Sequence, residues 1–218
     1  MSSARMKVAV LISGRGSNLK SLIEACAAPH FPAEIVLVIS NVTRAGGLEY
    51  ARTAGIPAVV VPHREYASRE TFDAAIEARL SQAGAEFVCL AGFMRILSEA
   101  FVRQWQGRLI NIHPSLLPAF RGVEVHEQVI QSGVRISGCT VHYVIPELDA
   151  GPPIAQAAVP VHAGDTPESL AARVLEQEHR LYPLALKLIA EGRVRLSGGR
   201  ATFDDVPSTD EILFNPPL

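Results

Sequence analysis

The sequence predicts an α/β protein with a mostly parallel sheet that helices cover on both faces. Five short apolar runs rich in β-branched residues indicate strands buried on both faces, and segments with helix signals lie between them. Such alternation is typical of a parallel sheet. After about residue 136, two longer strand-like runs follow one another without a helix, and we expect them to form an antiparallel strand pair near the C-terminus.

Each element has its own local signal. The buried strands are expected at 7–12, 35–39, 58–61, 87–91 and 109–112, and the antiparallel pair at 138–145 and 154–161. Helices are expected from near residue 18, over about 48–54, from 68 to about 82, and from 166 to 190. Ser68 and Thr166 suit the N-cap position, and Pro167 suits the first helical position. Pro183 should kink the last helix, because proline removes a backbone donor.

The composition indicates one globular domain, 1–218, with a core over about 7–195 and a surface tail over 199–218. Hydrophobic residues make up 48% of the chain and the net charge is −2, so we expect no nucleic-acid partner. The absence of a signal-peptide or membrane-length apolar run predicts a cytoplasmic protein without a membrane partner. Three cysteines without paired spacing predict neither a disulfide framework nor a metal site.

A glycine-rich turn, 13–17, connects the first strand to the first helix. Its glycines let backbone N–H groups at the helix start approach an anion, and Ser17 and Asn18 add side-chain donors, which makes the turn a candidate phosphate site. A dinucleotide site would need a third glycine, where Leu19 stands, and an acidic residue after the second strand, where the chain reads Ser-Asn. A purely structural turn is the alternative.

Asn111 and His113 leave the carboxyl end of the fifth strand, where ligands bind in open α/β sheets. In extended backbone the two side chains point to the same side, and Pro114 keeps His113 extended. A carboxamide and an imidazole that face one point form a candidate oxyanion site. The alternative is a buried pair that satisfies the backbone of a loop.

Asp149 lies in a turn-rich segment, 146–153, between the last two strands. A carboxylate beside an imidazole raises the imidazole pKa and orients the ring. An aspartate that binds its own turn is the common alternative. Spacing alone does not place Asp149 beside His113.

Four segments together resemble the phosphoribosylglycinamide formyltransferase family, the folate-dependent enzymes of purine synthesis. They read VLISGRGSNL at 10–19, LAGFMRIL at 90–97, NIHPSLLP at 111–118 and ELDAGP at 147–152. The resemblance covers about residues 7–195. It implies a doubly wound, Rossmann-like parallel sheet with the active site along its carboxyl edge.

The resemblance also implies residue roles, a reaction and ligands. Asn111, His113 and Asp149 would be catalytic, and Gly16, Ser17 and Asn18 would hold the substrate phosphate. Glu178 would lie near the substrate amine, and the folate site would comprise Arg69, Met94, Arg95, Ile96 and Leu97. The formyl group of 10-formyltetrahydrofolate, a co-substrate, would pass to glycinamide ribonucleotide without a metal. Monomer and homodimer both stay open.

One loop departs from the pattern that is expected for the family. After Pro118 the family often has a Pro-Gly pair and two histidines, but here only His126 remains and Glu124 stands at the other place.

Three other functions are rivals to the one that the resemblance implies. A formyl-folate hydrolase or a methionyl-tRNA formyltransferase would be expected to carry an additional domain. A non-catalytic binding protein for a phosphorylated metabolite would explain the glycine loop alone, but not the additional Asn111, His113 and Asp149.

Overall fold

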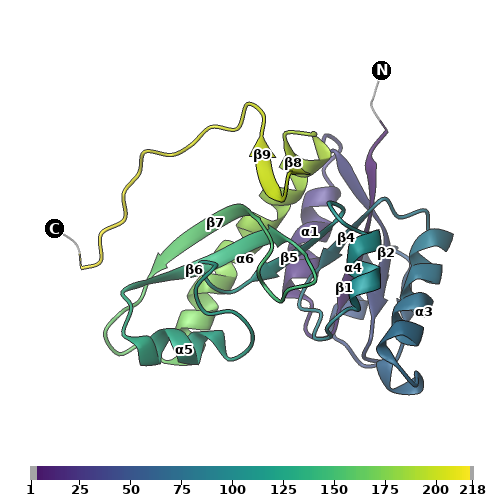
Figure 1. Cartoon of the computed structure of the whole chain (residues 1–218), viewed down its shortest axis with the longest axis horizontal. Coiled ribbons are helices and arrows are strands. Elements are labelled where there is room, and N and C mark those ends of the chain that lie inside the picture. The colour runs from purple at the N-terminus through teal and green to yellow at the C-terminus, as the bar shows by residue number, and fades with distance from the viewer. Residues whose placement is uncertain (1–3, 217–218) are drawn as a thin grey trace.

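The computed structural model describes residues 4–216, so residues 1–3 and 217–218 of the predicted 1–218 domain lie outside the described residues. The main sheet has the strand order β3-β2-β1-β4-β5-β6-β7 (Figure 1). Its strands are β1 (Met6–Ile12), β2 (Ala33–Ser40), β3 (Ala58–Val60), β4 (Phe87–Leu90), β5 (Leu109–His113), β6 (Ile136–Tyr143) and β7 (Pro153–Pro160). Strands β1 to β5 pair in parallel, whereas β5–β6 and β6–β7 are antiparallel. The predicted doubly wound, mostly parallel sheet is therefore confirmed.

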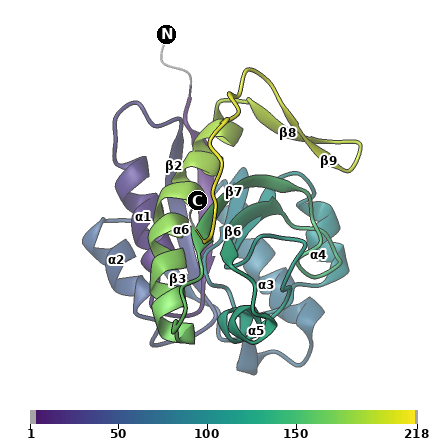
Figure 2. The same cartoon turned by 90° about the vertical axis from the view of Figure 1, so that its left-hand side faces the viewer.

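The helices lie on both faces of this sheet (Figures 1 and 2). They are α1 (Ser17–Cys26), α2 (Gly47–Thr53), α3 (Arg69–Gln82), α4 (Glu99–Gln104), α5 (Val125–Ser132) and α6 (Pro167–Ala190), with a 3-10 turn at His63–Glu65. One apolar core contains side chains of α1, α2, α5 and α6, and a second contains side chains of α3 and α4. Burial on both faces explains why β1, β2, β4 and β5 read as continuous apolar runs. The prediction of a buried strand at 58–61 is wrong in its burial, because β3 is the edge strand and is largely exposed.

The predicted caps are confirmed. Ser68 and Thr166 each accept a hydrogen bond from the backbone N–H three residues later, and each completes a capping box. Pro167 occupies the first position of α6, and Pro183 lies inside that helix, which continues to Ala190. No helix of residues 4–216 is both long and apolar enough to span a membrane.

The structure differs from the sequence prediction at three places. Helices α4 and α5 lie in segments where no helix was predicted. Part of the predicted surface tail is a strand, because β9 (Arg200–Phe203) pairs antiparallel with β8 (Val194–Ser197) in a small second sheet. The turn between them consists of Gly198 and Gly199, both with positive φ, which glycine adopts without steric cost.

Candidate functional site

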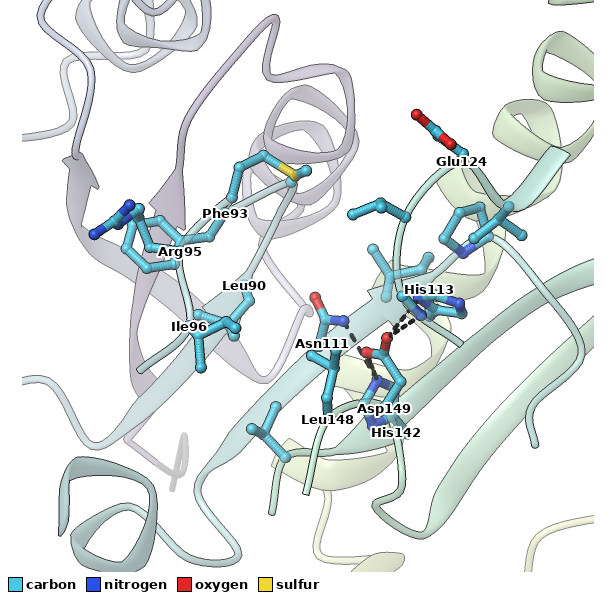
Figure 3. A pocket seen from close by; sticks show the side chains of 18 of the residues that line it. Leu90, Phe93, Arg95, Ile96, Asn111, His113, Glu124, His142, Leu148 and Asp149 are labelled. Atoms are coloured by element: carbon cyan, nitrogen blue, oxygen red, sulfur yellow. Dashed lines mark hydrogen bonds and ion pairs between the residues drawn. The ribbon is translucent and has the colours of Figure 1, made fainter. Parts of the chain in front are cut away.

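A cavity of about 710 Å³ opens at the carboxyl edge of the sheet. Its walls come from the start of α1, from the segments after β4, β5 and β6, from the start of α5, and from α6. Figure 3 shows an apolar side and a polar side, with Asn111 between them. The labelled apolar-side residues include Leu90, Phe93 and Ile96, and the polar side has His113, His142 and Asp149.

His113 and Asp149 lie together, which sequence spacing alone left open. His113 Nδ1 is 3.4 Å from Asp149 Oδ2, and both side chains are more than nine-tenths buried. His113 Nε2 donates to the carbonyl of Phe120 at 2.8 Å. An acceptor therefore faces each ring nitrogen, and neither N–H points freely into the cavity in this conformation.

Asn111 is held by His142, a residue to which sequence analysis gave no role. The two are cross-strand partners of β5 and β6, and Asn111 Nδ2 lies 3.3 Å from His142 Nε2. His142 Nδ1 donates to the Tyr143 carbonyl at 2.9 Å, so its Nε2 is free to accept from Asn111 when the ring is neutral. Burial lowers the pKa of His142, which favours that neutral form. His142 is fully buried.

The turn that carries Asp149 is fixed by backbone geometry. Asp149 has a φ of 48°, in the left-handed region, and its Oδ2 accepts from the backbone N–H of Gly122 at 2.9 Å. A Cβ added to Gly151 would lie 1.7 Å from the Tyr143 carbonyl oxygen, so only glycine fits there. The Tyr143 N–H also donates to the Pro152 carbonyl at 3.0 Å. These contacts hold the loop against β6.

Glu178 and Asn18 form a buried polar pair on another wall of the cavity. Asn18 Nδ2 donates to Glu178 Oε2 at 2.7 Å, and Glu178 is 7% exposed. Burial raises the pKa of Glu178, while the bond from Asn18 and the charge of His113 act in the opposite direction. Among the described residues, Asn18 Oδ1 is a buried acceptor without a partner. The pair therefore presents acceptor oxygens to a ligand that carries N–H groups.

The glycine turn is closely packed against the start of α2. Gly16 has a φ of 77° and precedes α1 without a side-chain cap, and a Cβ on it would lie 2.4 Å from the Cα of Gly47. The first backbone N–H groups of α1 have no partner within the helix. Asn18 lines the cavity, whereas Gly16 and Ser17 lie next to it in the chain but outside its lining.

The four predicted folate residues after β4 line the cavity together. Met94 is 67% exposed and Ile96 is 57% exposed, whereas Leu97 is buried. Arg95, which completes the set, is also exposed. The fifth predicted residue, Arg69, is the exposed first residue of α3 and lies outside the cavity lining. The structure therefore brings four of the five to one site.

The loop after Pro118, whose sequence differs from the family pattern, also contributes side chains to the cavity. His126 and Glu124 both line it, and Glu124 has a φ of 56° immediately before α5. Burial, followed by the nearby His113, lowers the pKa of His126. Arg121 pairs with Glu147 at 2.9 Å, which links this loop to the one that carries Asp149. Within residues 4–216, no group of three or more His, Cys, Asp or Glu side chains is arranged to hold a metal.

Comparison with known proteins gives consistent matches. Residues 6–186 match the formyl transferase family. The phosphoribosylglycinamide formyltransferase of Escherichia coli is 45% identical over 199 residues, which is 91% of this chain and 94% of that protein. The trifunctional purine biosynthetic protein adenosine-3 of Gallus gallus is 53% identical over 192 residues. That match covers 88% of this chain, but this chain spans only 19% of the length of the trifunctional protein.

The fold matches solved structures as well. The crystal structure of glycinamide ribonucleotide transformylase 1 from Symbiobacterium toebii superposes on this chain with a TM-score of 0.90 at 46% identity. The match covers 92% of this chain and 95% of the transformylase chain. Phosphoribosylglycinamide formyltransferase from Anaplasma phagocytophilum superposes with a TM-score of 0.86, also at 46% identity, over 94% of this chain and 97% of that one.

Proposed function

The chain belongs to the formyl transferase family, and from that premise we propose that it transfers the formyl group of 10-formyltetrahydrofolate to the amine of glycinamide ribonucleotide. The observation that supports this most directly is the convergence of Asn111, His113 and Asp149 on one wall of the cavity. Its volume of about 710 Å³ is within the range of small-molecule sites. A hydrolase or a metabolite-binding protein is the competing function.

Asn111 is proposed to stabilise the charge that develops during transfer. The neutral amine attacks the formyl carbon, and the carbonyl electrons move to the formyl oxygen. The attacking nitrogen then gives up a proton, N10 takes one up, and the C–N10 bond breaks as the C=O bond re-forms. Asn111 Nδ2 has two hydrogens, and His142 accepts only one of them. The other is available to the formyl oxygen, and its donor is already oriented before the substrates bind.

His113 and Asp149 are proposed to act as a pair. The Asp149 carboxylate lies 3.4 Å from His113 Nδ1, so it can accept the hydrogen of that nitrogen and orient the ring. In this conformation the hydrogen on Nε2 is used by the Phe120 carbonyl. For His113 to donate to the formyl oxygen, its Nε2 hydrogen bond to the Phe120 carbonyl must therefore break when the substrates bind.

The two substrates are proposed to enter from different sides. Gly16, Ser17 and Asn18 would hold the ribonucleotide phosphate at the start of α1, with its amine towards Glu178. The folate would lie along Met94, Arg95, Ile96 and Leu97, which are exposed or apolar lining residues. Arg69 is proposed to contact the outer end of the folate. We also propose that the protein is cytoplasmic and that it acts as a monomer or a homodimer.

The test is a spectrophotometric assay of 10-formyltetrahydrofolate loss with and without glycinamide ribonucleotide. Ribonucleotide-dependent loss supports the transferase, and loss without ribonucleotide indicates a hydrolase. Asn111→Ala should lower kcat about 100- to 1,000-fold, because one oxyanion donor is removed. Gln82→Ala, which removes an exposed carboxamide at the end of α3, is the matched control. Near-normal turnover of the Asn111 variant would refute its catalytic role.

A further inference from the structure

The segment 92–97, which we name the folate loop, lies between β4 and α4 and belongs to no helix or strand. Met94 and Ile96 project outwards and are more than half exposed, so these side chains do not hold the loop in place. The conformation of the segment therefore depends on hydrogen bonds to its backbone and on the packing of its buried side chains, Phe93 and Leu97.

Two of those contacts hold the beginning of the folate loop. The Ser13 hydroxyl accepts from the Met94 N–H at 2.7 Å and donates to Asn41 Oδ1 at 2.6 Å. Phe93 stacks on Phe72 of α3, with ring centroids 6.4 Å apart and nearly parallel planes. Both anchors act before the midpoint of the loop.

A third contact holds the end of the folate loop, and it comes from a buried charge. Asp73 of α3 accepts from the backbone N–H of Ser98 through Oδ2, at 2.6 Å. Asp73 is 3% exposed and is absent from the cavity lining. Ser98 already caps α4 with its own hydroxyl, which accepts from the Phe101 N–H at 3.3 Å. The Asp73 bond is therefore an additional restraint on the end of the loop, beyond what starts the helix.

Burying the Asp73 carboxylate has a free-energy cost. Among the described residues, Asp73 Oδ1 is buried without a hydrogen-bond partner. No salt bridge to Asp73 appears in the described part of the chain. A buried carboxyl oxygen without a hydrogen-bond partner lowers the stability of a fold, so a positioning role is a further reason for an aspartate at this place. Conflicts with local folding rules occur mainly where function requires them.

We propose that Asp73 is a positioning residue that holds the folate loop in its binding conformation before the folate arrives. This inference rests on the proposed function, because the ligand it assigns to the loop is the folate. Asp73 reaches the ligand only through the backbone of the loop. Its loss should therefore weaken folate binding and leave binding of the ribonucleotide at the start of α1 unchanged.

The experiment compares Asp73→Ala, Asp73→Asn and Ser137→Ala with the parent protein. Ser137 is the matched control, since its buried hydroxyl in β6 also lacks a partner among the described residues and lies outside the cavity lining. Calorimetric titration gives Kd for tetrahydrofolate and, separately, for glycinamide ribonucleotide. Hydrogen exchange of the 92–98 peptide reports the restraint on the loop without any ligand.

For Asp73→Ala we expect a tetrahydrofolate Kd that is about 10- to 100-fold higher, as for the loss of a hydrogen bond to a charged group. Exchange of the 92–98 amides should be faster, and the ribonucleotide Kd should stay within about twofold of the parent value. Asp73→Asn keeps an acceptor for Ser98 and should restore most of the affinity. Ser137→Ala should change neither Kd nor loop exchange.

Two outcomes would overturn the inference alone. One is an Asp73→Ala protein with parental tetrahydrofolate affinity and loop exchange. The other is an equal loss of affinity for both ligands, matched by Ser137→Ala, which would indicate general destabilisation. Failure of the parent itself to bind tetrahydrofolate would instead refute the proposed function, and loop exchange in Asp73→Ala would still decide whether the anchor exists.

Discussion

Replacing Gly151 by alanine should displace the Asp149 carboxylate while every proposed catalytic side chain remains present. Gly151 lies two residues after Asp149, in the loop that packs on β6. The added Cβ would lie 1.7 Å from the Tyr143 carbonyl oxygen and 3.4 Å from His142 Nδ1. The first of these atoms belongs to the backbone of β6, which is paired on both sides, so the loop is the part that must move.

The size of the movement follows from the contact distance. Real Cβ atoms essentially never approach a heavy atom more closely than 3.0 Å, so the loop must shift by at least 1.3 Å, from 1.7 to 3.0 Å. Asp149 Oδ2 is only 3.4 Å from His113 Nδ1 and 2.9 Å from the Gly122 nitrogen, and neither contact survives such a shift unchanged. Because a misplacement of about 1 Å can cost about 100-fold, we expect kcat to fall about 100-fold.

The assay measures kcat and KM for ribonucleotide-dependent loss of 10-formyltetrahydrofolate. Gly46→Ala is the control, because Gly46 has a φ of −59° and an added Cβ would meet its nearest atom at an ordinary 3.6 Å. Thermal unfolding and circular dichroism establish that the Gly151 variant is folded at the assay temperature. A folded Gly151→Ala protein with kcat within about threefold of the parent would show that Asp149 does not require this position, since the full effect of misplacement is about 100-fold.

Three further predictions follow from individual contacts. His142→Phe removes the acceptor that orients Asn111, so kcat should fall about tenfold, as expected for about 1.4 kcal/mol; unchanged kcat would exclude this orienting role. Gly16→Ala introduces a Cβ 2.4 Å from a backbone atom, so KM for the ribonucleotide should rise while KM for the folate does not. Arg173 holds the pKa of Asp165 well below its ordinary value of 3.8, so the stabilisation is present above pH 4 and is lost as the pH falls. The difference in free energy of unfolding between the parent and Asp165→Asn, measured with urea, should therefore shrink from pH 6 to pH 2.

Local signals in the sequence were sufficient for most of the fold. The buried strands were predictable because each is a short apolar run between polar breaks, and α3 and α6 because Ser68 and Thr166 cap them. Helix α5 gave no such signal, because Glu124 precedes it in a left-handed conformation without a side-chain cap. Helix α4 has a Ser98 cap but spans only Glu99–Gln104, too short for a periodic pattern.

From residue spacing alone, without the family resemblance, the site was predictable only where its residues are close in the chain. Asn111 and His113 share one strand, so their common direction followed from the period of two. The pairing of Asn111 with His142 depends on the register of two strands whose partner residues are distant in the chain. Asp73 was overlooked for a related reason: in sequence an aspartate on a polar helix indicates solvent, and only the tertiary structure shows that it is buried.

The loop between β6 and β7 leaves the sheet and returns to it at almost the same point. The Tyr143 N–H to Pro152 carbonyl bond, 3.0 Å long, closes its neck, and Gly151 packs against the Tyr143 carbonyl. Residues 144–150 therefore lie beyond a closed neck, so changes in their length or sequence need not alter the pairing of β6 with β7. The part of the loop that lines the cavity can therefore vary while the sheet that supports it stays the same.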